Sequence, residues 1–125
     1  MTIGYTMLGT NDPAKARAFY EPLLAQLGLT VNETYSSDTR TFFAPASALP
    51  MLVITKPHDG AAATHGNGTM VALMSPTREA VDKVYADAIA KGAKDEGPPG
   101  ERGPGFYGAY FRDLDGNKLF VFKMG

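Results

Sequence analysis

The sequence FYGAYFRDLDGNKLFVFKM, residues 106–124, decides the fold of this chain. Its two runs, 106–112 and 118–124, are rich in Phe, Tyr and Val, which are typical of strands. Between them, residues 113–117 read Asp-Leu-Asp-Gly-Asn. Glycine accepts positive φ without strain, and Asp and Asn side chains can hydrogen-bond to their own turn backbone. The stretch therefore predicts a β-hairpin with a five-residue connection.

Apolar side chains occupy both faces of the second predicted strand, where Phe120 and Phe122 alternate with Leu119 and Val121. A strand that is apolar on both faces is covered on both faces. We expect helices on one face, and a pocket or a partner subunit on the other.

A first helix is predicted after a strand over residues 2–9. Asp12 can cap its N-terminal N–H groups, Pro13 suits the first helical position, and Gly28 is a good terminator. Pro22 lies in the helix interior, so we expect either a bend near it or a later start of the helix. The apolar face of this helix consists of Phe19, Leu23 and Leu27, with Tyr20 and Leu24 beside it.

A second helix is predicted after a strand over residues 70–74. Ser75 and Pro76 repeat the cap-then-proline start of the first helix, and Gly92 ends the second one. The apolar face of this helix consists of Val81, Val84, Tyr85, Ala88 and Ile89.

The remaining segments are predicted as short strands and loops. Strands are expected near 30–35, 39–44 and 50–56. Residues 57–69 combine Gly, Pro and small polar residues and indicate a linker, and residues 93–105 indicate a Gly/Pro-rich loop.

The two halves of the chain have the same order of elements, which indicates an internal repeat. Each half predicts a strand, a helix that ends at glycine, and β-rich sequence. We expect an α+β protein of two βαβββ modules, at about 1–57 and 70–125, joined by a linker at about 58–69. One such module buries too little surface to stand alone, so two must pair, either within the chain or across a dimer.

Composition narrows the function classes. Twelve Lys and Arg against thirteen Asp and Glu give a net charge of -1, which offers no reason to expect nucleic acid or an anionic membrane as partner. The absence of Cys excludes disulfides, thiol catalysis and zinc–cysteine sites. The start of the sequence lacks the pattern of a secretory signal, and no apolar run approaches membrane-spanning length, so we expect a cytoplasmic protein.

Three stretches match one protein family in the same order along the chain. They are YTMLGTNDPAKARAFYEPLLAQLG (5–28), MVALMSPTREAVDKVYADAIAKG (70–92) and FRDLDGNKLFVF (111–122). They resemble the two strand–helix segments and the final hairpin of the glyoxalase/bleomycin-resistance/extradiol-dioxygenase superfamily, the vicinal oxygen chelate proteins. The resemblance implies mixed sheets curled around an open cup, in which a metal and a substrate usually sit, and it implies that dimers are common.

The positions at which the resemblance implies His or Glu metal ligands carry other residues: Tyr5, Ile54 (or a residue near it), Met70 and Phe120. Tyr rarely binds such metals, the Met thioether is a soft ligand, and Ile and Phe cannot bind. A catalytic metal site needs three or more His or carboxylate groups around an open position. The resemblance thus implies the fold without the usual metal chemistry, and we expect no metal and no cofactor.

Other side chains suggest where a ligand could bind. Arg40 and Phe42 share one strand face, and Arg102 could reach an anionic ligand from its loop. His58 and His65 lie in the linker, match no metal motif and are interpreted as loop residues. No catalytic group can be assigned from local motifs. The predicted ligand-binding residues are Tyr5, Arg40, Phe42, Ile54, Met70, Arg102, Tyr107 and Phe120, with Tyr35 and Tyr110 as further candidates to line the cup.

Three functions remain open at this point. The first is a small-molecule binder without the family's metal, acting as a homodimer. The second is an enzyme, either a lyase or dioxygenase-type protein with other metal ligands, or a metal-free isomerase that uses Tyr5 or Arg40. The third is a non-catalytic module whose cup is filled by its own side chains.

Overall fold

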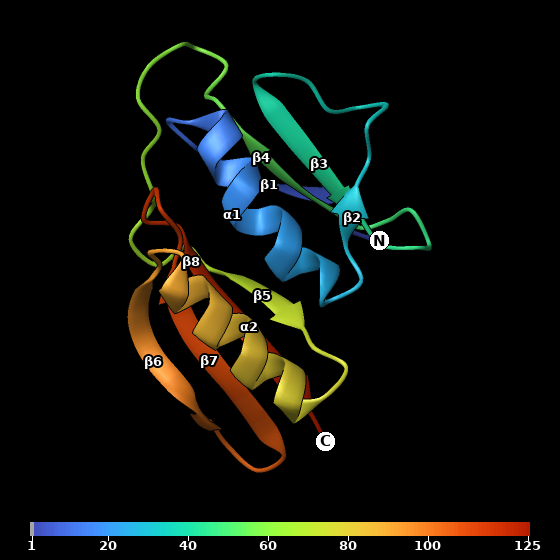
Figure 1. Cartoon of the computed structure of the whole chain (residues 1–125), viewed down its shortest axis with the longest axis vertical. Coiled ribbons are helices and arrows are strands. Elements are labelled where there is room, and N and C mark those ends of the chain that lie inside the picture. The colour runs from blue at the N-terminus through green and yellow to red at the C-terminus, as the bar shows by residue number, and fades with distance from the viewer. Residues whose placement is uncertain (1) are drawn as a thin grey trace. The chain divides into compact units, whose positions relative to one another are not determined.

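The computed structural model describes residues 2–125, and Figure 1 shows the order of the elements. The chain divides into two compact units, the first ending at His65 and the second beginning at Gly66. Each unit has one helix and four strands within the described residues. The elements are β1 (Tyr5–Gly9), α1 (Pro13–Ala25), β2 (Thr30–Val31), β3 (Arg40–Ala44), β4 (Met51–Thr55), β5 (Val71–Met74), α2 (Arg78–Ala90), β6 (Lys94–Glu101), β7 (Phe106–Arg112) and β8 (Lys118–Met124).

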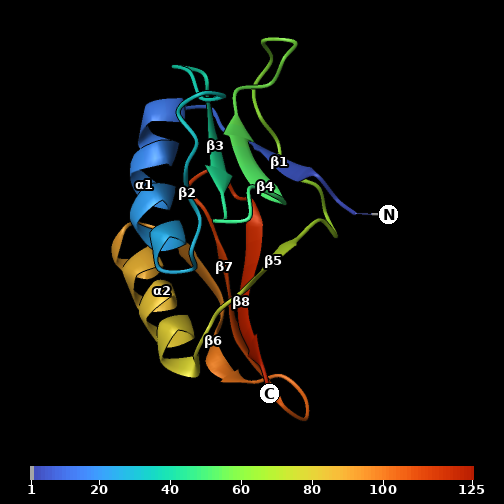
Figure 2. The same cartoon turned by 90° about the vertical axis from the view of Figure 1, so that its right-hand side faces the viewer.

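Both sheets are mixed and open, with the same topology. In the first unit the strand order is β1-β4-β3-β2, and in the second it is β5-β8-β7-β6. The pairs β1–β4 and β5–β8 are parallel, and the other neighbours are antiparallel. In each unit the helix lies against one side of its own sheet (Figure 2). The predicted α+β class with two βαβββ modules is therefore confirmed.

The first helix begins where the sequence predicts. The Asp12 carboxylate accepts a hydrogen bond from the Lys15 N–H at 3.1 Å, and Pro13 is the first helical residue. The helix continues through Pro22, so the later start that this proline suggested does not occur. At the other end Gly28 has φ of +83°, and the Leu29 N–H bonds back to the Leu24 carbonyl, five residues earlier, as at many helix ends.

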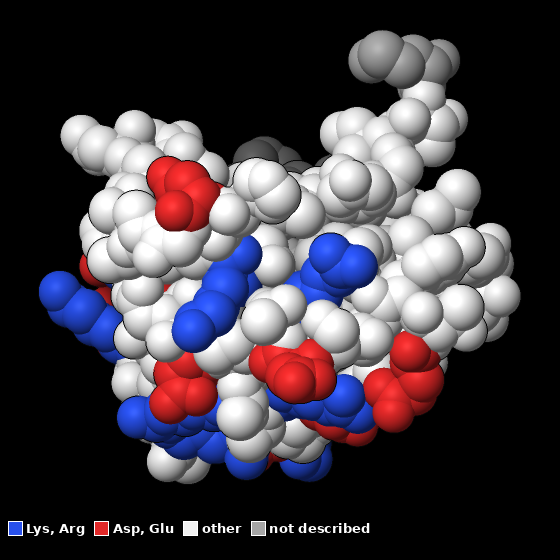
Figure 3. Space-filling view, turned by 90° about the horizontal axis from the view of Figure 1, so that it is seen from above, with Lys and Arg blue, Asp and Glu red and all other residues white. Residues whose placement is uncertain are grey.

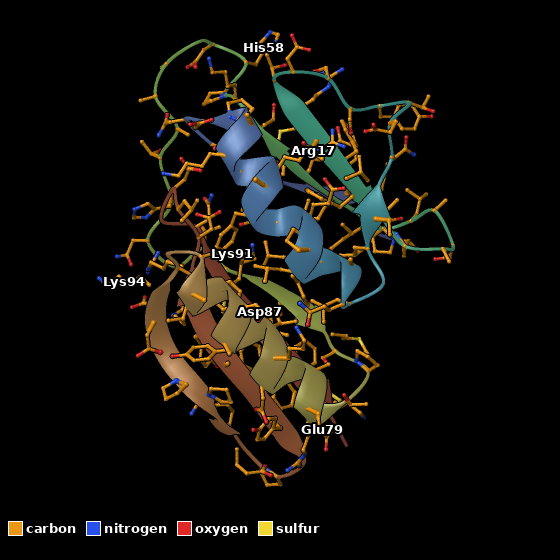
Figure 4. The ribbon with its side chains drawn as sticks, viewed as in Figure 1. Arg17, His58, Glu79, Asp87, Lys91 and Lys94 are labelled. Atoms are coloured by element: carbon orange, nitrogen blue, oxygen red, sulfur yellow. The ribbon has the colours of Figure 1, made fainter. Side chains whose placement is uncertain are left out.

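The second helix starts two residues later than predicted. Thr77, rather than Ser75, is the N-cap, and its hydroxyl accepts a hydrogen bond from the Ala80 N–H at 3.0 Å. The Ser75 hydroxyl instead donates to the Thr77 carbonyl, which orders the turn before the helix. Figure 4 shows Glu79 in the first turn and Lys91 at the opposite end, where each charge opposes the helix dipole.

The C-terminal hairpin is confirmed with its predicted boundaries. Strands β7 and β8 pair from Phe106↔Met124 to Arg112↔Lys118. The Asp113 carboxylate organises the connection because it accepts hydrogen bonds from the Asn117 backbone N–H, the Asn117 side-chain amide and the Asp115 N–H, each at 2.9 Å. The buried polar groups of the turn are therefore hydrogen-bonded to one another within residues 113–117.

The prediction of a loop over residues 93–105 is wrong for most of its length, because residues 94–101 form β6 at the edge of the second sheet. The pairing with β7 shifts register between Asp95 and Gly97 and again between Gly97 and Gly100. An edge strand tolerates prolines, and β-bulges absorb extra residues. The segment therefore pairs with the free edge of β7 and forms a strand, although its composition indicates a loop.

The strand expected near residues 30–35 is also shorter than predicted and covers only Thr30–Val31. The chain then turns, because the Asn32 side chain accepts a hydrogen bond from the Tyr35 N–H and its carbonyl accepts one from the Ser36 N–H. Residues 57–69 contain neither helix nor strand, as expected for the predicted linker.

Each helix covers its sheet with the predicted apolar face. Phe19, Tyr20 and Leu23 of α1 are at most 3 % exposed, and Val81 and Val84 of α2 are at most 1 % exposed. Neither helix of the described chain has the length and apolarity that a bilayer crossing requires.

Candidate functional site

We call the side of each sheet turned away from its own helix the open face. In the first unit, Tyr20 of α1 packs on Phe43 with ring centroids 6.2 Å apart, so the side chains that alternate with Phe43 point to the open face. In the second unit, the Tyr107 hydroxyl contacts Asp82 of α2, so Phe106, Gly108 and Tyr110 belong to the open face.

The open face of the first unit brings three predicted residues together. The Tyr5 ring meets the Phe42 ring edge-on at 6.0 Å, and the Arg40 guanidinium lies 5.8 Å from the Phe42 ring centre. Tyr35, from the turn after β2, adds a third ring 5.8 Å from Phe42. This cluster is an aromatic surface with one cation, and Tyr5 and Tyr35 are both more than half exposed.

Ile54 does not join this cluster, and its predicted place is wrong. In the β3–β4 pair, Ile54 lies opposite Thr41, whereas Phe42 lies opposite Val53. Side chains alternate between faces along a strand, so Ile54 points to the α1 side, where it is 2 % exposed. Val53 is the β4 residue that lies beside Phe42.

The open face of the second unit carries four aromatic rings with nearly parallel planes, which we call the ring stack: Phe106, Tyr110, Phe120 and Phe122. The Tyr110 and Phe120 rings lie 4.3 Å apart, and the Phe120 and Phe122 rings lie 5.3 Å apart. Phe106 lies 5.1 Å from Phe122, with an angle of 4° between the two planes. Two residues named from the sequence belong to the ring stack: Phe120, and Tyr110 as a further candidate. The central position of Phe120 leaves it 3 % exposed.

Gly108 makes the ring stack possible. A Cβ atom at this position would lie 2.4 Å from Cε1 of Phe120 and 2.8 Å from the Val121 carbonyl oxygen. The Phe120 ring therefore occupies the space that a side chain would fill in an ordinary strand. This role follows from cross-strand packing, so the sequence alone carries no signal for it beyond a glycine between aromatic residues.

Two cations lie over one ring of the stack. The Arg102 guanidinium carbon is 5.4 Å from the centre of the Tyr110 ring, and the Lys118 ammonium nitrogen is 5.2 Å from it. Such cation–π contacts are favourable while the cation still faces solvent. Arg102 was expected to reach an anionic ligand from its loop, and Lys118 was not among the predicted residues. The structure places both side chains over Tyr110.

A partly exposed ion pair lies at the same end of the open face. The Arg112 guanidinium bonds the Glu96 carboxylate at 2.8 Å. The hydrogen bond from Arg112 lowers the pKa of Glu96 below its ordinary value, with smaller contributions from the charges of Arg112, Lys118 and Lys94. Glu96 is therefore ionised at neutral pH, and its charge is shared among several cations.

Tyr107 was predicted to line the cup but faces α2 instead. Its hydroxyl donates to the Asp82 carboxylate at 2.5 Å, and the Arg78 guanidinium lies 4.9 Å from its ring centre. The hydrogen bond to Asp82 raises the pKa of the Tyr107 hydroxyl. The prediction failed because strand parity places residue 107 on the face opposite Tyr110.

The other predicted residues lie outside both aromatic clusters. Met70 precedes β5 and is 41 % exposed. His58 lies on the loop after β4, as Figure 4 shows, and His65 ends the first unit. In the face that Figure 3 shows, Lys and Arg side chains alternate with Asp and Glu side chains rather than forming a patch of one sign.

The comparisons with known proteins agree on the family. A family model described as Glyoxalase/Bleomycin resistance protein/Dioxygenase superfamily matches residues 2–121. The chain belongs to this superfamily. None of the curated proteins matches the chain.

Solved structures of the superfamily are similar over nearly the whole chain. A glyoxalase/bleomycin resistance protein from Albidiferax ferrireducens T118 is 35% identical, with a TM-score of 0.88 and 98% of each chain covered. A glyoxalase/bleomycin resistance protein/dioxygenase family enzyme from Burkholderia phytofirmans PsJN has a TM-score of 0.78 at 22% identity, with all of both chains covered. At this identity the similarity supports only a shared fold.

The superfamily implies a metal, but the side chains at the expected positions do not fit one. Tyr5, Ile54, Met70 and Phe120 include one phenol, one thioether and two hydrocarbons. Within residues 2–125, no three His, Asp or Glu side chains gather closely enough to hold a metal ion. We therefore derive no chemical step through a metal.

A separate cavity of about 250 Å³ lies in the first unit, between the end of β1 and the loop after β4. The Asn11 amide oxygen accepts a hydrogen bond from the Ala63 N–H at 2.7 Å, which fixes this loop. Sequence reasoning missed the cavity because its walls come from a segment of small residues without a motif. The lining residues are Thr10, Asn11, Lys56, Pro57, Gly60, Ala61 and Ala62.

Proposed function

We propose that this protein binds a small molecule with a planar apolar part on the open face of its second sheet, without the metal that is usual in the superfamily. The ring stack is the observation that carries the proposal. Three of its rings, Phe106, Tyr110 and Phe122, remain partly accessible. Solvent-accessible aromatic side chains that are held in fixed positions are typical of small-molecule sites.

The order of the ring stack favours binding over mere packing. Phe106, Phe120 and Phe122 have planes within 7° of one another. Because Gly108 lets Phe120 lie close to the backbone, the rings hold one arrangement before any ligand arrives. A preformed surface loses little conformational entropy when it binds, which improves affinity.

Titration with the neutral aromatic probe 2-naphthol tests this function. We expect saturable binding, seen as shifts of amide signals from β7 and β8 in NMR spectra. The Phe122→Leu variant keeps an apolar side chain but removes one ring, and it should weaken binding by about three- to tenfold. The matched control is Tyr85→Leu, which removes a ring from α2 and should leave binding unchanged. Absence of saturable binding, or equal loss in both variants, would count against the proposal.

We also infer that two copies of the chain associate. Large apolar side chains are exposed on strands at the sheet edges: Met7 of β1 is 51 % exposed and Met74 of β5 is 71 % exposed. Ile3, just before β1, is 64 % exposed. Exposed apolar groups on unpaired strand edges favour association with another chain.

Light scattering after size-exclusion chromatography tests this association. The expected mass is twice the 13.3 kDa of one chain. Met7→Lys and Met74→Lys should each shift the protein toward the monomer, because a buried lysine would lose its hydration. Leu49→Lys changes an equally exposed residue outside the strands and should leave the mass unchanged. A wild-type protein that is monomeric at high concentration would contradict the inference.

A further inference from the structure

We propose that the ligand of the open face of the second sheet is an aromatic carboxylate, whose anionic group is bound by Arg102 and Lys118 while its ring packs on the ring stack. This inference rests on the proposed function and adds the chemical class of the ligand. It follows from three observations: the two cations over Tyr110, the rigid placement of Arg102, and the position of the rings along β8.

Within residues 2–125 neither cation forms an ion pair, although the charge of Lys118 helps to lower the pKa of Glu96. The ion pairs that do form include Arg112 with Glu96 and Arg78 with Glu101. Both cations nevertheless lie within 5.4 Å of the centre of one ring. The Glu96 carboxylate already forms an ion pair with the Arg112 guanidinium, with a distance of 2.8 Å between Oε1 and Nε. This end of the open face therefore has an excess of positive charge, which complements an anion.

The backbone of β6 holds the Arg102 side chain in place. A Cβ atom at Gly97 would lie 3.1 Å from Nη2 of Arg102 and equally close to the Tyr110 ring. A Cβ atom at Gly100 would lie 3.7 Å from Nη1, which is an ordinary contact, and Nη2 donates to the Pro98 carbonyl oxygen. Because guanidinium has several N–H donors in a planar fork, this bond leaves others for a carboxylate. Gly97 thus leaves the space that the Arg102 guanidinium and the Tyr110 ring occupy.

The spacing along β8 matches a ring attached directly to an acid group. Lys118, Phe120 and Phe122 lie on the same face, and side chains two residues apart on a strand are separated by roughly 6–7 Å. A bicyclic ring attached to a carboxylate near Lys118 extends along β8, past the buried Phe120, toward the partly accessible ring of Phe122. An anion without a ring would leave the ring stack unused, and a ring without a charge would leave the two cations unused.

Three probes with the same bicyclic ring test the charge preference near neutral pH: 2-naphthoate, 2-naphthol and 2-naphthylmethylammonium. We expect naphthoate to bind about tenfold more tightly than naphthol, which corresponds to one or two charge-assisted contacts. The ammonium probe should bind more weakly than naphthol. Raising the salt from about 50 to about 500 mM should weaken the binding of naphthoate far more than that of naphthol, since salt screens exposed charges.

Substitutions identify the residues that cause the preference for naphthoate over naphthol. Arg102→Gln and Lys118→Gln should each weaken naphthoate binding by about three- to tenfold and change naphthol binding by less than about twofold. The matched controls are Arg78→Gln, whose guanidinium lies over Tyr107 on the α2 side, and Lys123→Gln, on the other face of β8. Neither control should alter the preference for naphthoate.

The outcomes separate the two proposals. If naphthol and naphthoate bind equally well to the open face, the aromatic-carboxylate inference is overturned while the proposed function stands. If the controls reduce naphthoate binding as much as the two test variants do, the inference is likewise overturned. If none of the three probes shifts the signals of β7 and β8, both proposals fail for this face.

Discussion

Replacing Gly108 by alanine is expected to lower the free energy of unfolding by about 2–3 kcal/mol, as overpacking of a core commonly does. The new Cβ would meet the Phe120 ring at 2.4 Å and the Val121 carbonyl oxygen at 2.8 Å. A ring can rotate, but the carbonyl belongs to the neighbouring strand, so the β7–β8 pair must separate locally. In a protein of this size the melting temperature should fall by about 8–12 °C.

Urea unfolding followed by circular dichroism measures this loss, with Gly4→Ala as the matched control. A Cβ atom at Gly4 has nothing within 4 Å, so the control should retain the wild-type midpoint. We also expect Gly108→Ala to weaken 2-naphthol binding, because the Phe120 ring must leave its place in the ring stack. Equal stability of the two alanine variants would show that Phe120 does not need the space above Gly108.

The Asp113→Ala variant is expected to lose about 2–4 kcal/mol, because three hydrogen bonds to a buried carboxylate disappear together. Asp113 is 5 % exposed, and its oxygens accept from the backbone N–H groups of Asp115 and Asn117 and from the Asn117 side chain, each at 2.9 Å. Alanine would leave these donors without that acceptor in a turn that water reaches poorly.

Chemical unfolding of two comparison variants tests this reason. Asp113→Asn keeps one acceptor oxygen and should lose only about 1–2 kcal/mol. Asp38→Ala removes a carboxylate from an exposed turn and should change the stability by less than about 0.5 kcal/mol. A loss at Asp38 as large as that at Asp113 would mean that net charge, rather than the turn, determines the effect.

The candidate site was only partly predictable. Tyr5, Arg40 and Phe42 were expected together and do lie together, because Arg40 and Phe42 share strand parity and β1 belongs to the same sheet. Ile54 and Tyr107 were expected with them but point to the helix-covered sides. An error of one residue in strand parity moves a side chain to the opposite face.

The ring stack was likewise only partly predictable from the sequence. The sequence contains its four aromatic residues, and their spacing in the hairpin is plain from the alternation along β7 and β8. The contact of Arg102 and Lys118 with one ring depends on the pairing of β6 with β7, including two register shifts around Gly97. No local pattern encodes these shifts, since they arise where an irregular segment meets a free strand edge.

By itself, the sequence determined the elements whose signals are local. The hairpin over residues 106–124, the helix that starts after Asp12 and the glycines that end both helices depend on turn chemistry, capping and backbone freedom within a few residues. The same local signals in the same order were sufficient to indicate the family. Tertiary structure alone decided the edge strand β6, the faces on which Ile54 and Tyr107 lie, and the placement of two cations over Tyr110. These features depend on which strands pair and in which register, and pairing energy comes from residues that are distant in the chain.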